Sequence, residues 1–188
     1  MMLGLRRMAS GEIRGKAECC ALLREFIVAY GVCRVFAGMR EDNAHVVLAS
    51  IVEHLQQQPT AAVLSSIERV DALTDATESA GFHRLISFAS KALNMLGQRV
   101  PLYSSEGLAY LGLKQPASYE AFHAAWTQAY EPLRAAYESA AAKHLQRDGS
   151  SSSLESSLGA EWFAMRGFDV RLLRVGGPMR SAGGKSKR

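Results

Sequence analysis

FHRLISFASKALNMLGQRVPLYSSEGLAYLGL, residues Phe82 to Leu113, carries the central helical pattern of the chain. Its apolar residues recur at three- and four-residue steps: Phe82, Leu85, Ile86, Ala89, Leu93 and Leu96. This spacing places them on one side of a helix, so we predict a helix with one buried face. Pro101 ends the helical region, because proline disfavours helical geometry at the residue before it. Ser104 or Ser105 then caps a second helix, which makes the stretch a helix, a short extended link and a helix.

Helical spacing continues on both sides of this stretch. Upstream, it predicts helices over about 10–36, over 46–55 and from a cap at Thr60 to about Leu73. Downstream, Ser118 caps a long helix that runs to about Gln146, and a capping box at Ser152 and Glu155 begins the last helix. We expect Pro132 to kink the long helix near residue 130, because proline costs about 3 kcal/mol in a helix interior. Aromatic residues line one side of that helix and predict a core seam: Tyr119, Phe122, Trp126, Tyr130 and Tyr137.

The chain has almost no alternating apolar and polar pattern of the kind that strands show. We therefore predict an all-α fold, a single-domain helical bundle. Its 188 residues suit one domain with a sizeable core. We expect a flexible N-terminus over 1–9, a helical domain over 10–174 and a disordered basic tail over 175–188, where Gly and Ser alternate with basic residues.

The charge of the chain is concentrated at its C-terminus. The formal net charge is +4, and this excess is matched by four terminal cations, Arg180, Lys185, Lys187 and Arg188. The rest of the chain is close to neutral and lacks the broad basic face typical of nucleic-acid-binding proteins.

The sequence predicts no metal site, no cofactor and no membrane span. The three cysteines, Cys19, Cys20 and Cys33, lack metal-ligand spacing, and we interpret them as reduced thiols of a cytoplasmic protein. The histidines form no metal-binding pair, and no glycine-rich phosphate loop or hydrolase elbow is present. No apolar run approaches the ~18 residues that a membrane span needs.

Two blocks of the chain resemble a known family. The first contains Ser90-Lys91, Leu93, Pro101-Leu102-Tyr103 and Leu111-Gly112. The second is AEWFAMRGFDVRLLRV, matched at Glu161, Trp162, Phe163 and Gly167. Both resemble small bacterial proteins with the fold of 8-oxoguanine DNA glycosylase, within the helix-hairpin-helix glycosylase superfamily. The resemblance covers about residues 81 to 170 and implies the helical fold of that superfamily.

The resemblance also implies positions for catalysis, Lys91 and Ser104. In the family an Asp follows the aromatic residue of the first block, and here Ser104 occupies that place. A glycosylase uses a carboxylate to stabilise positive charge on the sugar or to activate a nucleophile, and a neutral hydroxyl does neither. Lys91 invites a nucleophilic role, but it lies outside the apolar set of its helix, and this spacing favours a Lys that extends its ammonium to solvent or contacts a phosphate. The resemblance therefore implies a divergent or catalytically degenerate relative.

Further residues are assigned to binding. His83, Arg84, Ser90 and Arg99 are candidates for nucleic-acid contacts, and a solvated cation at a helix start is the alternative for Arg84. Tyr103, Trp126 and Trp162 are candidates for a base pocket, since glycosylases stack flipped bases on aromatic rings. The function expected from the resemblance is binding of DNA or damaged bases, with or without base excision. A non-enzymatic helical module that binds a protein partner is the alternative.

Overall fold

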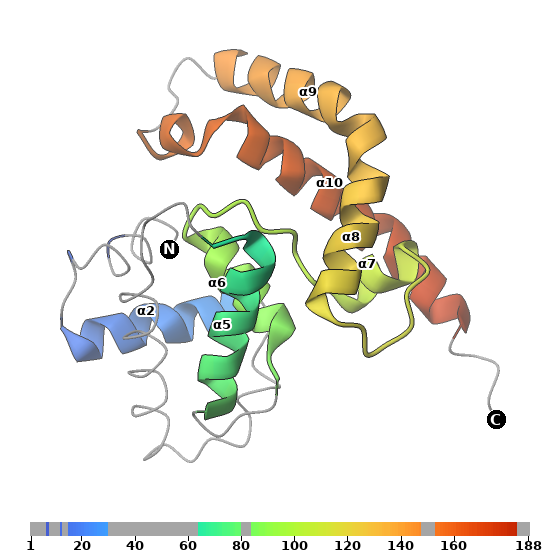
Figure 1. The fold of residues 1–188 in the computed structure, drawn as a ribbon. Helices are drawn as coiled ribbons and strands as arrows, with labels where there is room; N and C mark the ends of the chain where they lie inside the picture. The colour runs from blue at the N-terminus through green and yellow to red at the C-terminus, as the bar shows by residue number, and fades with distance from the viewer. Residues whose placement is uncertain are drawn as a thin grey trace. The chain divides into compact units, whose positions relative to one another are not determined.

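The computed structural model describes residues 7, 12, 15–29, 64–79, 84–147 and 153–183, and over these the chain is all-α, as predicted (Figure 1). No strand occurs in this part of the chain. The chain divides into two compact units, Met1–Gln98 and Arg99–Arg188. This boundary falls inside the range 10–174 that we expected to form one domain.

The first unit contains α2 (Lys16–Ala29), α5 (Ser66–Ser79) and α6 (Ile86–Met95). α5 and α6 pack together, and their buried faces include Val70, Leu73, Phe88 and Leu93. The start of α5 is stabilised by a reciprocal pair at Ser65 and Glu68. The amide of Glu68 donates to the Ser65 hydroxyl at 3.2 Å, and the amide of Ser65 donates to the Glu68 carboxylate at 2.6 Å. The expected helix over 46–55 and the expected cap at Thr60 lie outside the described residues.

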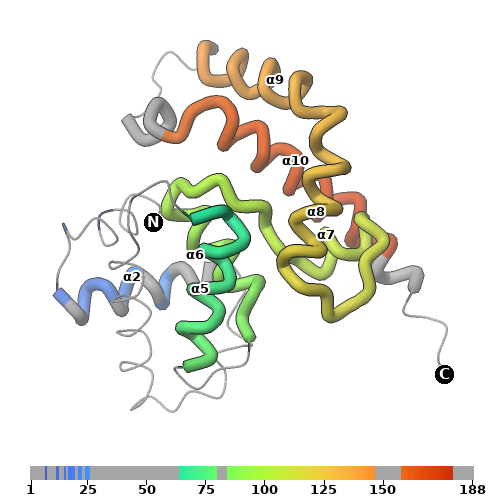
Figure 2. The backbone as a smooth tube through the Cα atoms, viewed as in Figure 1, coloured from blue at the N-terminus to red at the C-terminus, as the bar shows by residue number. Residues whose placement is uncertain are grey.

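The second unit contains α7 (Ser105–Tyr110), α8 (Tyr119–Tyr130), the 3-10 turn η1 (Glu131–Leu133), α9 (Arg134–Arg147) and α10 (Ser153–Gly183). α10 packs against both α7 and α9, and Figure 2 shows α9 running beside the first part of α10. The predicted kink at Pro132 is confirmed, because η1 separates α8 from α9 at that residue. The proposed capping box residue Ser152 lies outside the described residues.

Aromatic side chains form the core of the second unit around Phe168, which is fully buried. The ring of Phe168 lies 5.2 Å from Trp126, 5.4 Å from Tyr130 and 5.9 Å from Tyr137, measured between centroids. These distances suit the offset and edge-to-face contacts that aromatic rings prefer. The aromatic seam predicted along the long helix is therefore confirmed as part of the core, with Tyr137 half-buried and the other four side chains buried.

Two glycines of α10 let neighbouring helices approach closely. A Cβ atom on Gly176 would lie 1.9 Å from the carbonyl oxygen of Glu106 in α7, and one on Gly167 would lie 3.0 Å from the ring of Tyr137 in α9. Within α10, Gly159 interrupts the helix with φ 75° and ψ 162°. The helix then continues to Gly183, beyond residue 174 where we expected a disordered tail to begin. Gly176 lies past that boundary and packs against α7, so the prediction that this part does not pack is wrong.

Candidate functional site

The extended link over residues 99–104 is held to the rest of the second unit at every residue. Arg99 pairs with Glu161 at 2.5 Å. The carbonyl oxygens of Val100 and Pro101 each accept a hydrogen bond at 3.0 Å, from the Arg166 guanidinium and the Tyr119 hydroxyl respectively. The Leu102 amide donates to Asp169 of α10, and the Tyr103 hydroxyl donates to the carbonyl oxygen of Ala117. The Ser104 hydroxyl accepts from an amide in the first turn of α7. The link is thus a fastened segment, and three of its contacts go to α10.

Ser104 serves as the N-cap of α7. Its hydroxyl accepts a hydrogen bond from the amide of Gly107 at 2.9 Å, and the residue is 9% exposed. The backbone of Ser104 is extended, which is the usual geometry of a cap. Space around the hydroxyl is tight, because a Cβ atom on Gly107 would come within 3.2 Å of both Ser104 Oγ and the Phe122 ring. The prediction that Ser104 or Ser105 caps this helix is confirmed for Ser104.

Asp169 is the buried carboxylate of the second unit. It lies on α10 and is 2% exposed. Its Oδ1 accepts a hydrogen bond from Nε1 of Trp126 at 2.8 Å and a longer one from the amide of Leu102 at 3.4 Å. Its Oδ2 forms an ion pair with Arg166, one helical turn earlier. One carboxylate therefore connects α8, the 99–104 link and α10.

The environment of Asp169 favours its protonated form. Burial raises the pKa of Asp169 to about 6, from 3.8 for an exposed aspartate, because a buried carboxylate loses its hydration. Arg166 and the hydrogen bonds from Trp126 and Leu102 oppose this rise, but they do not cancel it. At neutral pH the site therefore holds an ionised carboxylate at a cost in free energy.

Arg166 joins the carboxylate to the link. Its side chain is 14% exposed and contacts both the Asp169 carboxylate and the Val100 carbonyl oxygen. Its guanidinium carbon also lies 5.7 Å from the centre of the Trp162 ring, a distance at which a cation is attracted to an aromatic face. Neither Arg166 nor Asp169 was among the site residues predicted from the sequence. The sequence signal for this pair is Arg-x-x-Asp, a spacing that puts both side chains on one face of a helix.

The three aromatic residues proposed for a base pocket have structural contacts. The Tyr103 hydroxyl donates to the carbonyl oxygen of Ala117 at 2.8 Å, and its ring lies 5.1 Å from Phe122. Trp126 is 3% exposed and bonds to Asp169, and Trp162 is 7% exposed and lies against Phe163. Tyr103 is the half-buried member of the three. Each ring is therefore part of the packing, and the two tryptophans offer little surface to a base.

The residues proposed to contact nucleic acid lie in different surroundings. Arg84 is exposed and donates to Asp71 at 3.1 Å. Ser90 is fully buried and donates to the Ser87 carbonyl oxygen at 3.3 Å, which leaves no surface for a phosphate at this serine. Arg99 is exposed and pairs with Glu161. His83 lies outside the described residues.

Lys91, the other proposed catalytic residue, is half-buried on α6 of the first unit, whereas Ser104 belongs to the second.

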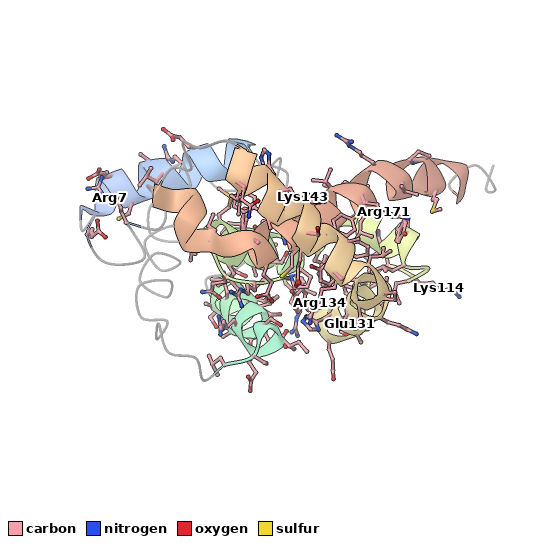
Figure 3. The ribbon with its side chains drawn as sticks, turned by 90° about the horizontal axis from the view of Figure 1, so that it is seen from above. Arg7, Lys114, Glu131, Arg134, Lys143 and Arg171 are labelled. Atoms are coloured by element: carbon pink, nitrogen blue, oxygen red, sulfur yellow. The ribbon has the colours of Figure 1, made fainter. Side chains whose placement is uncertain are left out.

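The C-terminal half of α10 presents exposed basic and apolar residues. Arg171 and Arg174 are exposed, and Figure 3 labels Arg171 on this helix. The Arg171 guanidinium donates to the hydroxyl oxygens of Tyr137 and Tyr110, and these contacts raise its pKa. Four large apolar side chains of the same segment are also exposed: Val170, Leu173, Val175 and Met179. We call the exposed basic and large apolar residues of this segment the α10 surface: Val170, Arg171, Leu173, Arg174, Val175 and Met179.

In the part of the chain that the structure describes, no cluster of three or more His, Cys, Asp or Glu side chains is arranged to hold a metal ion. None of the described helices combines the length and the apolar character that crossing a membrane requires. Comparison with known proteins found no family model, no curated protein and no solved structure that matches this chain.

Proposed function

We propose that this chain is a non-catalytic helical protein that binds nucleic acid through the α10 surface and the basic residues that follow it. The observation that carries the proposal is the charge of residues 170–188. This segment has no Asp or Glu and contains six basic residues: Arg171, Arg174, Arg180, Lys185, Lys187 and Arg188. A run of cations without acids attracts the phosphate backbone of nucleic acids, largely independently of base sequence.

The geometry of α10 supports this role. The buried face of the helix packs on α7 and α9, so Arg171 and Arg174 remain exposed to solvent. The hydroxyl oxygens of Tyr137 and Tyr110 accept from the Arg171 guanidinium and raise its pKa, so Arg171 keeps its positive charge at neutral pH.

Base excision finds less support than binding. The hydroxyl of Ser104 is used to cap α7, and it replaces the carboxylate that the resemblance implies. Asp169 is a carboxylate in the same unit, but it is 2% exposed and bound to Trp126 and Arg166. Neither residue is placed to stabilise charge on a sugar, so we assign the chain a binding role without turnover.

A protein partner is the second candidate. The exposed Val170, Leu173, Val175 and Met179 of the α10 surface favour it, because exposed apolar side chains on one helix are typical of protein interfaces. The acidic side chains of such a partner would form ion pairs with Arg171 and Arg174, which lie between these apolar residues in the sequence.

The experiment is a DNA-binding titration over a series of salt concentrations. A fluorescent DNA duplex is titrated with the wild-type chain, with Arg171→Gln/Arg174→Gln and with Arg134→Gln. Arg134 is an exposed arginine of α9, labelled with Glu131 in Figure 3, and it pairs with Glu131 and Glu138, so it serves as a control. We expect binding that weakens steeply with salt. The double variant should reduce the slope of log K against log salt by about two, because two phosphate contacts are lost.

Three outcomes would contradict the proposal. The first is a salt-independent affinity, and the second is an equal loss of affinity in the Arg134→Gln control. The third is release of a free base from a lesion-containing duplex, since this would make the chain an enzyme. If an acidic protein binds the α10 surface and the duplex does not, the second candidate replaces the first.

A further inference from the structure

We propose that the α10 surface binds a single strand of nucleic acid in preference to a duplex, with its arginines on the phosphates and its aliphatic side chains against unpaired bases. This inference rests on the proposed function, because it names the class of nucleic acid that the same surface takes. The observation behind it is the set of exposed apolar side chains, which binding through phosphates alone leaves unexplained.

Exposed apolar side chains are concentrated on the α10 surface. Among the described residues, the large apolar side chains that are exposed all belong to it, and each is at least 38% exposed: Val170, Leu173, Val175 and Met179. Such side chains gain free energy when a ligand removes them from water. A ligand that contacts only the arginines would leave them in water.

The basic and apolar side chains are ordered around the exposed side of the helix. With about 3.6 residues per turn, Arg171 and Arg174 lie along the middle of this side. Two apolar side chains flank the arginines on each edge: Val170 and Leu173 on one, Val175 and Met179 on the other. A phosphate backbone that follows the arginines would therefore place its sugars and bases over aliphatic side chains.

A single strand matches this pattern better than a duplex does. In a single strand the faces of the bases are exposed and can pack on side chains, whereas in a duplex they are stacked on one another. A duplex is read through the edges of its bases, by side chains that form hydrogen bonds. Residues 170–179 contain two arginines and no other side chain that can hydrogen-bond to a base edge.

The distribution of charge also favours one strand over two. Six cations lie in residues 170–188 and the whole chain has a net charge of +4, so the rest of the chain is slightly acidic. A duplex presents two phosphate backbones, and proteins that bind it commonly offer a broad basic face. The narrow strip formed by Arg171 and Arg174 suits a single backbone.

An aromatic ring lies beside the α10 surface. Tyr110 at the end of α7 is half-buried, and its hydroxyl oxygen accepts from the Arg171 guanidinium. Proteins that bind single strands commonly combine basic side chains with aromatic rings on which bases stack. A base next to a phosphate on Arg171 would therefore lie close to this ring.

The test is a fluorescence-anisotropy titration of the full-length chain with three labelled probes. These are a DNA oligonucleotide, an RNA oligonucleotide of the same sequence, and the duplex of the DNA oligonucleotide with its complement. At equal salt, we expect at least one single strand to bind about tenfold more tightly than the duplex. Comparison of the two single strands shows whether the 2′-hydroxyl of RNA contributes.

Two double variants separate the apolar contacts from the phosphate contacts. Leu173→Ser/Val175→Ser should weaken single-strand binding about fivefold or more and leave the duplex affinity and the salt slopes unchanged, because no cation is lost. Arg171→Gln/Arg174→Gln should weaken binding of all three probes and lower the salt slope for the single strand by about 1.4. Circular dichroism checks that both variants keep the helical fold.

The outcomes distinguish this inference from the proposed function. Equal or tighter binding of the duplex would overturn the inference and leave the proposed function in place. An unchanged single-strand affinity in Leu173→Ser/Val175→Ser would do the same. Absence of binding to all three probes would overturn both. Binding of such a chain to vesicles of phosphatidylserine and phosphatidylcholine would then assign the surface to an anionic membrane.

Discussion

Nε1 of Trp126 lies 2.8 Å from Oδ1 of Asp169 and donates a hydrogen bond to it, although 43 residues separate the two in sequence. Both residues are at least 97% buried, so water cannot replace this bond. The bond connects α8 to α10 inside an aromatic core, beside the Arg166 ion pair. A buried acceptor that loses its donor costs more free energy than an ordinary hydrogen bond contributes.

Trp126→Phe should therefore lower the free energy of unfolding by about 2 kcal/mol, because it keeps an aromatic ring but removes the donor to a charged acceptor. Urea denaturation measures the change. Trp162→Phe is the matched control, since Nε1 of Trp162 is buried without a hydrogen-bond partner among the described residues. Equal losses in the two variants would mean that ring size, and not the bond to Asp169, determines the effect.

The stability of the chain should depend on pH through Asp169. Its folded pKa of about 6 exceeds the exposed value of 3.8, so between these values the folded state holds a proton that the unfolded chain has released. The contribution of this group to the free energy of unfolding should therefore fall as the pH rises, by ~2 kcal/mol between about pH 4.5 and pH 7.

Urea denaturation of the wild type and Asp169→Asn at both pH values isolates this contribution. Other titrating groups, such as Glu68 with its lowered pKa, are common to both chains and cancel in the difference. A wild-type chain that gains stability over Asp169→Asn toward neutral pH would show that the pKa of Asp169 is lowered, not raised.

Gly176→Ala should be among the most damaging small substitutions in the second unit. The new methyl group would lie 1.9 Å from the Glu106 carbonyl oxygen, and backbone cannot move aside as a flexible side chain can. We expect a loss of about 3 kcal/mol or more, because overpacking at this contact would separate α10 from α7.

Gly167→Ala places a methyl group in a less crowded contact of the same helix, so its loss of stability can be compared with that of Gly176→Ala. Its methyl group would meet only the Tyr137 ring, at 3.0 Å, so we expect a loss of about 1 kcal/mol. Thermal and urea denaturation measure both variants. If both losses are similar, the close approach of α10 to α7 does not limit the stability of the unit.

Substitutions of Ser104 distinguish its role as a helix cap from a catalytic role. Ser104→Ala should cost about 1 kcal/mol, because the Gly107 amide loses its acceptor. Ser104→Asp should keep most of the stability, since aspartate is also a good cap, and it restores the carboxylate that the family resemblance implies.

Denaturation and a base-release assay on lesion-containing DNA check both Ser104 variants. We expect no base release from either variant, because the capping contact holds the side chain against the Gly107 amide. Base release by Ser104→Asp would return the site to the glycosylase interpretation.

The fold class and several details of the helices could be predicted because they depend on neighbours within a few residues. The cap at Ser104, the kink at Pro132 and the buried aromatic seam of α8 follow from local hydrogen bonding, the geometry of proline and helical spacing. A disordered tail was expected over 175–188, because Gly and Ser alternate with basic residues there, but α10 continues to Gly183 and Gly176 packs against α7.

The sequence predicted the residues of the candidate site less well than it predicted the helices. Trp126 was predicted for a base pocket, but its partner is Asp169, an acid that the sequence analysis did not select. Ser90 was predicted to contact phosphate, but it lies on the buried side of α6. The spacing of residues in the sequence predicts on which face of a helix a side chain lies. Its contact partner depends on which other helix packs against that face.

The helical character of this protein and the link that follows its first helix could be predicted from the sequence, because chain geometry and local bonding suffice for these. The division of the chain at residue 98, the bond between Asp169 and the link and the contact of Gly176 with α7 became visible only in the three-dimensional structure. These features arise from contacts between segments far apart in the chain. Burial and through-space pairing, which set the energy of such contacts, are not encoded in the spacing of neighbouring residues.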